Sequence, residues 1–300
     1  MGIKVLLDTD IGTDIDDAVC LAYLLSNPDC NLMGITTVSG EAVQRAQMAD
    51  ALCRAAGQAV PIYPGAENPL LVPQIQTKAQ QAIQLKNWKH ETSFPPGQAV
   101  PFLAQTIRSN PREIILLSIG PMTNLALLFR MDPEIPSLLK GLVSMCGIFT
   151  NRTAGVGPQE WNALLDPHAT AIVYSSCLNF HRSIGLDVTV KVQMKVEEFR
   201  DRFQTPLLRV VEDFAQVFFQ KAKTVIFHDP LAAATVFDPD ICVFQKGLVE
   251  VEYTSPNEKV RGMTLWTPDV FLPESEKARH EVALTVDSDR FFSHYFSVFS

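Results

Sequence analysis

The chain has 300 residues, with 25 Lys and Arg against 33 Asp and Glu and a formal net charge of −8 at neutral pH. Its 47% hydrophobic and 19% charged residues supply a large core, which excludes global disorder. The acidic balance argues against a nucleic-acid surface, and the lack of any run of 18 apolar residues argues against a membrane span. We therefore expect a small-molecule partner.

Short apolar runs alternate with amphipathic segments over the first two thirds of the chain. This alternation is typical of βαβ units around a largely parallel sheet. In chain order we expect strand Ile3–Asp8, helix Asp16–Leu25, strand Leu32–Val38, helix Glu41–Gly57, strand Pro61–Tyr63, helix Gln98–Ser109, strand Ile114–Ser118, helix Pro121–Phe129, strand Gly141–Met145, helix Asp166–Ser175 and strand Leu178–Ile184.

The pattern changes near residue 190. Val192–Ala222 has the periodicity of two helices without a strand between them, and Leu231–Phe237 that of a further helix. The Gln-, Lys- and Pro-rich segment Asn68–Pro96 is expected to form a mobile flap or an irregular helix. Polar alternation predicts late strands that extend the sheet in mixed or antiparallel fashion, at Val243–Tyr253, Arg261–Trp266 and His280–Val286.

The chain shows no repeat and no long linker. We therefore predict one α/β domain over residues 1–300, with a mostly parallel, mixed central sheet flanked by helices. The first residues lack the pattern of a signal peptide. The thiols lack CxxC spacing, which predicts a reduced, cytoplasmic protein; they are Cys20, Cys30, Cys53, Cys146, Cys177 and Cys242.

A dense run of acids follows the first strand. It holds five carboxylates within ten residues and no Lys or Arg, namely Asp8, Asp10, Asp14, Asp16 and Asp17. Ligands bind at the carboxyl ends of strands in open α/β sheets, and crowded carboxylates suit an oxygen-ligated ion such as Ca²⁺ or Mg²⁺. Capping of a helix N-terminus accounts for one or two of these acids but not for five.

Two other families of acidic loops fit this run less well. An EF-hand loop that starts at Asp8 needs Gly and Glu where Thr13 and Val19 stand. A haloacid-dehalogenase-like phosphatase also ends its first strand in DxDx(T/V), but Gly12 occupies the Thr/Val position here. The phosphatase stays open as an alternative.

A second cluster, His228-Asp229-Pro230, precedes a helix of small residues. Asp229 is expected to be the N-cap of that helix, with Pro230 at the first helical position. His228 can donate or accept a proton near neutral pH.

Two more clusters lie in the middle of the chain. Glu160-Trp161-Asn162 places two hydrogen-bonding side chains around an aromatic ring, which suits sugar hydroxyls, although a plain turn explains it as well. The run 118–124 passes from a strand end through Gly-Pro into a helix, and such a turn leaves backbone carbonyls free to ligate a cation.

Together these motifs resemble the nucleoside hydrolase family, the inosine-uridine preferring ribohydrolases. Members hold Ca²⁺ at the bottom of the pocket and cleave the N-glycosidic bond of ribonucleosides with water. The resemblance implies a Rossmann-like nucleoside hydrolase fold, a ribonucleoside substrate, and a homodimer or homotetramer. Besides the acidic run, its motifs are Ile35–Gly40, Gly120–Asn124, Glu160–Asn162, Asp166-Pro167, His228–Pro230 and Gly262–Thr264.

The resemblance also implies roles for individual residues. Asp10 becomes both a calcium ligand and the general base that activates a metal-bound water. Asp17, Asp229 and the main-chain carbonyl of Ile119 complete the calcium ligands, and His228 assists the departing base. The resemblance assigns substrate contacts to Asp16 or Asp14, Met145, Glu160, Trp161 and Asn162.

The chain departs from the family pattern at four places, one of which is Cys146-Gly147-Ile148 in place of a glycine-rich run after Met145. Ile15 and one further acid interrupt the motif D-x-D-x-G-x-D-D, so Asp14 and Asp16 compete for the ribose, with Asp16 favoured by its spacing into the helix. Glu41 stands where many members have Asn. The histidine-glycine flap motif is missing unless His90-Glu91 takes its place. Purine or pyrimidine preference and acceptance of deoxyribose therefore stay open, as does a non-catalytic nucleoside- or sugar-binding relative.

Overall fold

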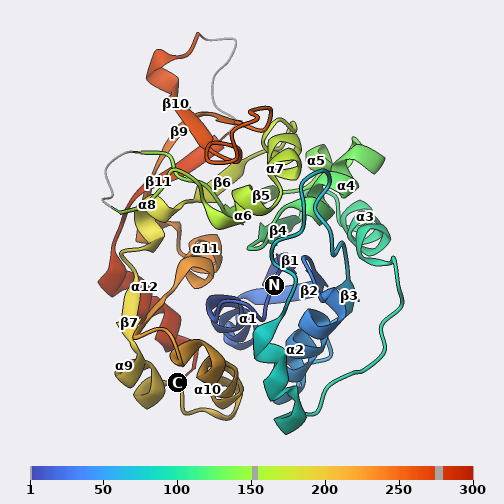
Figure 1. Cartoon of the computed structure of the whole chain (residues 1–300), viewed down its shortest axis with the longest axis vertical. Coiled ribbons are helices and arrows are strands. Elements are labelled where there is room, and N and C mark those ends of the chain that lie inside the picture. Colours follow the sequence, from blue (N-terminus) through green and yellow to red (C-terminus); the bar gives the residue numbers. More distant parts are fainter. Residues whose placement is uncertain (1, 151–154, 274–279, 300) are drawn as a thin grey trace.

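The computed structural model describes residues 2–150, 155–273 and 280–299. Within these ranges one mixed sheet has the strand order β10-β9-β11-β6-β5-β4-β1-β2-β3 (Figure 1). Its strands are β1 (Ile3–Thr9), β2 (Cys30–Thr37), β3 (Ile62–Pro64), β4 (Ile114–Ser118), β5 (Gly141–Met145), β6 (His181–Ile184), β9 (Cys242–Val251), β10 (Thr264–Pro268) and β11 (His280–Val286). A separate antiparallel pair consists of β7 (Gln193–Lys195) and β8 (Thr224–Ile226).

Helices occupy most of the connections between the strands. In chain order, with η marking 3₁₀ helices, they are α1 (Asp16–Ser26), α2 (Ala42–Ala55), η1 (Gln80–Asn87), α3 (Ala99–Ser109), α4 (Thr123–Met131), α5 (Ile135–Leu138), α6 (Trp161–Leu165), α7 (Pro167–Tyr174), α8 (Leu186–Thr189), α9 (Val196–Arg202), α10 (Pro206–Phe219), α11 (His228–Phe237), η2 (Pro239–Ile241), η3 (Asp269–Phe271) and α12 (Ser288–Ser297). No helix in the described ranges combines the length and the apolar character that crossing a membrane requires.

Strand β1 is buried on both faces of the sheet. Because successive side chains of a strand point in opposite directions, Val5 and Leu7 join a core with α1, α2, α10, α11 and α12, whereas Leu6 joins a second core with α3, α4 and α7. All three side chains are fully buried. The sheet is therefore the middle layer of three.

The position of β1 in the sheet decides where a ligand can bind. It pairs in parallel with β2 on one side and with β4 on the other, so that Leu7 lies opposite both Ile35 and Leu117. The chain builds the sheet outward in opposite directions from this point, which makes it a topological switch point. A crevice outside the carboxyl ends of the strands is expected there, and the acidic loop after β1 leads into it.

The predicted α/β architecture is confirmed. Strands β1 to β6 pair in parallel, and β9 pairs antiparallel with both β10 and β11, as the polar alternation of the late strands indicated. The weakly periodic segment 68–96 contains η1 and is otherwise irregular.

Two local predictions are wrong, and one strand was not predicted. Helix α4 begins at Thr123, so Pro121 lies before it rather than in its first turn. The range Val192–Ala222 contains the two expected helices, α9 and α10, without a strand between them, but its first residues form strand β7, which pairs with β8. The sequence did not reveal β7, because a three-residue strand carries too little periodicity to detect. Helix α11 begins at His228, so Asp229 lies within the first turn and is not the N-cap. The Asp229 N–H donates instead to a carboxylate oxygen of Asp16, 3.2 Å away, and this contact with another helix takes the place of a side-chain cap.

Candidate active site

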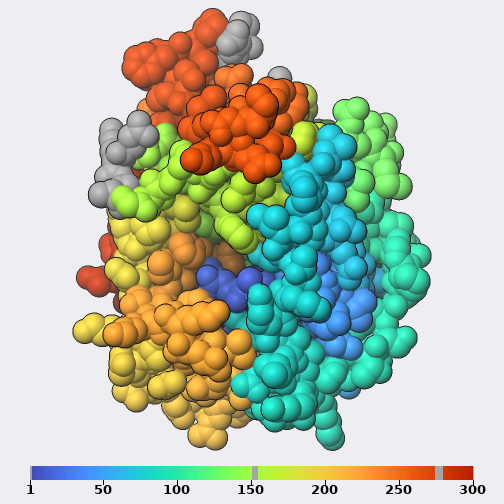
Figure 2. Space-filling view, in the orientation of Figure 1, coloured from blue at the N-terminus to red at the C-terminus, as the bar shows by residue number. Residues whose placement is uncertain are grey.

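A cavity of about 320 Å³ opens at the carboxyl ends of β1 and β4. In the space-filling view the N-terminal segment (blue) is visible at the centre of this face, between the cyan residues that follow β3 and the orange C-terminal half (Figure 2). Every residue to which the resemblance assigned a catalytic, metal-binding or substrate-binding role lies in the wall of this cavity. The lining residues are Asp10, Thr13, Asp14, Asp16, Asp17, Gln76, Ile119, Met145, Glu160, Trp161, Asn162, Leu186, Phe218, His228 and Asp229.

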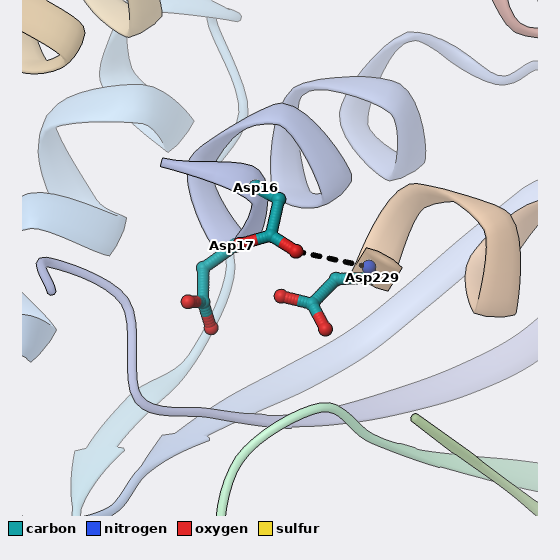
Figure 3. A group of neighbouring side chains, drawn as sticks. All are labelled: Asp16, Asp17 and Asp229. Atoms are coloured by element: carbon teal, nitrogen blue, oxygen red, sulfur yellow. Dashed lines mark hydrogen bonds between the residues drawn. The ribbon is translucent and has the colours of Figure 1, made fainter. Parts of the chain in front are cut away.

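Three buried carboxylates converge at the bottom of this site. Asp16 and Asp17 lie in the first turn of α1 and Asp229 in the first turn of α11, and each offers an oxygen within 4.8 Å of the others (Figure 3). The two helices pack against each other, and both carry small, fully buried side chains, among them Ala18 on α1 and Ala233 on α11. Residues more than 200 positions apart thus form one acidic cluster.

The acidic cluster has no ion-pair partner among the described residues, and the charge of the buried Arg45 lowers only the pKa of Asp17 among the three, as the smallest of its causes. Burial raises the pKa of Asp16, Asp17 and Asp229 well above the usual range for Asp, and repulsion among neighbouring carboxylates raises it further. None of the ion pairs seen in the described ranges involves these three acids. Two helix N-termini compensate only part of such charge. The donor set therefore fits a divalent cation with oxygen ligands.

Asp10 leaves β1 into the same cavity and is 6% exposed. The side-chain amide of Gln76 donates a hydrogen bond to Asp10 Oδ2. Burial raises the pKa of Asp10, and the nearby guanidinium of Arg45 opposes this shift. Space beside the carboxylate depends on Gly120, where a Cβ atom would lie 2.8 Å from Asp10 Oδ1.

The two acids that compete for the ribose occupy different positions. Asp16 is 3% exposed and belongs to the acidic cluster. Asp14 is exposed at the mouth of the cavity, and its Oδ1 accepts the N–H of Ile15 at 2.7 Å. Burial thus separates the pair, with Asp16 at the bottom and Asp14 at the rim.

Asn162 connects the ends of two strands. Its Nδ2 donates to the main-chain carbonyls of Ile119 and Met145, each at 3.0 Å. No hydrogen bond within the described ranges occupies its Oδ1, and this oxygen can accept from a ligand. Glu160 fixes the position of Asn162, because its carboxylate caps α6 by accepting the N–H groups of Asn162 and Ala163, at 2.7 and 3.0 Å.

His228 contributes an imidazole with one defined partner. Its Nδ1 lies 2.7 Å from the hydroxyl oxygen of Thr189 at the end of α8. Burial lowers the pKa of His228 to about 4, so the ring is neutral at pH 7. If the Thr189 hydroxyl donates to Nδ1, Nε2 carries the proton and becomes a neutral hydrogen-bond donor.

Residues that the sequence left open as lid elements lie outside the cavity wall. Glu41, at a φ of 62°, accepts hydrogen bonds from the side chain of Lys78 and the N–H of Ala79. His90 contacts the carbonyl of Trp88, and Glu91 pairs with Arg54 on α2 at 3.6 Å. The segment that follows β3 enters the cavity wall through Gln76 instead.

Sequence reasoning missed four of the lining residues. Thr13 lies inside the acidic run and Gln76 in a segment without periodicity, so neither stood out from its neighbours. Leu186 and Phe218 read as core residues, because an apolar side chain beside a helix end is far more often buried than part of a pocket wall.

Comparison with known proteins agrees with this geometry. The profile of the family "Inosine-uridine preferring nucleoside hydrolase" matches residues 5–293. The chain belongs to this family. It is therefore a hydrolase acting on N-glycosyl bonds of ribonucleosides, and the comparison favours this activity over the phosphatase alternative.

Individual relatives cover nearly the whole chain. The inosine-uridine preferring nucleoside hydrolase of Leishmania major is 29% identical and covers 96% of this chain and 95% of its own. Uridine nucleosidase 1 of Arabidopsis thaliana is 27% identical, with coverages of 83% and 78%. Among solved structures, the purine-preferring ribonucleoside hydrolase from Gardnerella vaginalis superposes with a TM-score of 0.83 at 25% identity, over 98% of this chain and 97% of that one.

Proposed function

We propose that this nucleoside hydrolase binds Ca²⁺ through Asp10 together with two members of the acidic cluster, and that it releases free base and ribose from ribonucleosides. The observation that supports this most strongly is the meeting, in one cavity, of three buried carboxylates that form no ion pair with a described residue, an amide oxygen free to accept from hydroxyls, and an imidazole. Asp10, Asp17, Asp229 and the carbonyl of Ile119 would hold the ion. When bound, Ca²⁺ supplies positive charge that orients ribose hydroxyls and acidifies water.

The general base in this proposal is Asp10. Cleavage of a glycosidic bond passes through an oxocarbenium-like transition state, which requires one group to activate water and another to assist the leaving group. The carboxylate of Asp10 takes the proton of the attacking water. Asp16 and Asn162 Oδ1 accept hydrogen bonds from the ribose hydroxyls, with Glu160 beside them and Met145 and Trp161 as walls; Asp14 at the rim is the alternative to Asp16.

The leaving base is assisted by His228. Because its pKa is lowered to about 4, it acts at neutral pH as an N–H donor to the base and not as an imidazolium. The hydrogen bond between Thr189 and Nδ1 fixes the orientation of the ring, so that Nε2 points away from Thr189. Stabilising the departing base in this way lowers the barrier most for bases that leave poorly.

One experiment tests this function. Purified protein is incubated with a panel of purine and pyrimidine ribonucleosides and deoxyribonucleosides, with Ca²⁺ and with a chelator, and free base and sugar are quantified. We expect release that needs Ca²⁺. Binding without release would instead support a non-catalytic nucleoside-binding relative, and release that survives complete chelation would contradict the metal assignment.

The assembly and compartment belong to the same proposal. We expect a homodimer or homotetramer, which light scattering coupled to gel filtration measures directly. All six cysteines are free thiols. This supports a cytoplasmic, reducing environment.

A further inference from the structure

We infer that Gln76 is a positioning residue that couples the orientation of Asp10 to that of Trp161, and so links the general base to the cavity wall. The inference rests on the proposed function for the role of Asp10. The inference is argued from the side-chain amide of Gln76, which makes a hydrogen bond at each of its two ends. Gln76 Nε2 donates to Asp10 Oδ2, and Gln76 Oε1 accepts the indole N–H of Trp161 at 2.6 Å.

The chemistry of the two partners fixes which way this amide points. An ionised carboxylate only accepts hydrogen bonds, and an indole N–H only donates. The NH₂ end must therefore face Asp10 and the carbonyl end must face Trp161. The same NH₂ also lies 3.3 Å from the hydroxyl of Ser39. Gln76 is only 4% exposed, and turning its amide over would set two donors against each other at Trp161 and two acceptors against each other at Asp10.

The backbone around Gln76 is held just as firmly. We call residues 74–79 the strap. The Ser39 hydroxyl donates to the Gln76 carbonyl at 3.3 Å, and the Gln76 N–H donates to the side chain of Gln74 at 2.8 Å. At Gly40 a Cβ atom would lie 2.7 Å from the Gln76 carbonyl oxygen, so glycine lets the strap lie directly on the loop after β2.

A buried cation ties the strap to the acidic loop. Arg45, 0% exposed, donates to the carbonyls of Asp10 and Ile11 on one side and of Lys78 on the other. The strap and the loop that carries Asp10 therefore form one rigid unit, from which Gln76 reaches across the cavity to α6.

The partner on α6 needs this support. Trp161 is 48% exposed, and an indole with that much free surface has space for several rotamers. Its hydrogen bond to Gln76 selects one of them. A base or ribose that packs on Trp161 therefore acts on the same amide that orients Asp10, so wall contacts affect turnover as well as binding.

The first test is a double-mutant cycle between Gln76 and Trp161. Gln76→Met keeps the side-chain length and removes both hydrogen bonds, while Trp161→Phe keeps a smaller aromatic ring and removes the indole N–H. For hydrolysis of a ribonucleoside we expect Gln76→Met to lower kcat about 10-fold, with a smaller change in KM. Trp161→Phe should lower kcat about 3-fold, and the double variant should be no slower than Gln76→Met, because both changes break one linkage. The inference would be overturned if the kcat losses of the two single variants multiplied in the double variant, or if kcat of Gln76→Met stayed within 2-fold of the parent.

The second test does not depend on activity. The Trp161 contribution to the fluorescence is the difference between parent and Trp161→Phe. In Gln76→Met this contribution should show lower anisotropy and stronger quenching by acrylamide, and Asp10→Ala should produce the same change because it removes the other end of the linkage. Gln84→Met, on η1 away from the cavity, is the matched control and should change neither property. If the parent hydrolyses no nucleoside, the proposed function fails while this test still decides the coupling.

Gln76→Glu is a second variant that tests the inference if Gln76→Met fails to fold. It keeps the length and the acceptor for Trp161 but replaces the donor beside Asp10 with a second carboxylate. We expect kcat to fall by at least 10-fold and the Trp161 contribution to the fluorescence to change in the same direction as in Asp10→Ala, because both variants lose the hydrogen bond at the Asp10 end of the linkage. Full activity in this variant, or a Trp161 contribution unchanged from the parent, would overturn the inference.

Discussion

At the scale of single residues, the imidazole of His228 donates a hydrogen bond to the leaving base in the proposed function. His228→Ala should lower kcat about 10²–10⁴-fold on natural ribonucleosides, the range typical of a positioned proton donor. Hydrolysis of a nitrophenyl riboside, whose leaving group needs no such help, should fall far less. The measurement is kcat on both substrates. Equal losses on both would remove His228 from leaving-group assistance.

Thr189 provides the matched change, since it touches His228 and not the substrate cavity. Thr189→Val keeps the shape and removes the hydroxyl that lies 2.7 Å from Nδ1. We expect an intermediate loss on natural substrates, and again little on the nitrophenyl riboside, because the ring then loses its preference for one tautomer. Comparison of kcat on the two kinds of substrate distinguishes loss of the tautomer preference from a general loss of stability, which would lower kcat on both alike.

Arg45 is the second residue whose surroundings allow a sharp prediction. It is fully buried, and burial lowers its pKa while the charge of Asp10 opposes the shift. Arg45→Met removes the side-chain donor from the buried carbonyls of Gly40, Asp10 and Ile11, so we expect a loss of about 3 kcal/mol in the free energy of unfolding. Arg45→Lys, which keeps the charge but not the planar fork, should recover only part of it. Urea denaturation measures both, and a loss below ~1 kcal/mol for Arg45→Met would contradict this role.

At the scale of elements, the acidic cluster joins the first turns of α1 and α11. In the proposed function a cation neutralises these carboxylates, whose charge is costly to bury. Ca²⁺ at 100 times its Kd should therefore stabilise the fold by about 2.7 kcal/mol, seen as a rise in Tm that a chelator reverses. Asp229→Asn removes one charge from α11 and should abolish most of this rise while leaving the apo Tm equal or higher. An unchanged Ca²⁺ response in this variant would place the ion elsewhere.

Prediction from sequence succeeded for elements whose information is local. The acidic run follows a buried strand, so its place at the carboxyl end of β1 followed from strand geometry alone. The prediction that Asp229 is the N-cap of α11 was wrong. The N–H of Asp229 donates to Asp16 on another helix, and no local sequence pattern encodes that contact. Gln76 stayed hidden for the same reason, since its environment comes from the loop after β2, the end of β1 and the start of α6.

At the scale of the whole molecule, the central sheet carries a buried polar group far from the cavity. His181 on β6 is 1% exposed, and its Nε2 lies 3.0 Å from the Ser144 hydroxyl on β5. Its Nδ1 has no hydrogen-bond partner within the described ranges. Burial lowers the pKa of His181 well below 6.5, and the neighbouring His280 lowers it further. The folded protein therefore holds this ring neutral where the unfolded chain protonates it.

The sign of the pH dependence follows directly. Because the folded pKa lies below the unfolded one, His181 contributes stability that is fully present above about pH 6.5 and is lost as the pH falls toward the folded pKa. The loss approaches about 1.4 kcal/mol per pH unit. The buried acids of the site, whose pKa values are raised, act in the opposite direction, so the parent curve alone does not isolate the histidine. His181→Asn removes the titration and keeps a polar group for Ser144.

Urea denaturation of both proteins between pH 7.5 and 5 should show the parent losing stability relative to His181→Asn below pH 6.5, whatever the difference in stability between the two proteins at pH 7.5. Parallel curves would mean that the ring titrates alike in the folded and unfolded states, which a neutral imidazole held between β5 and the second core does not allow.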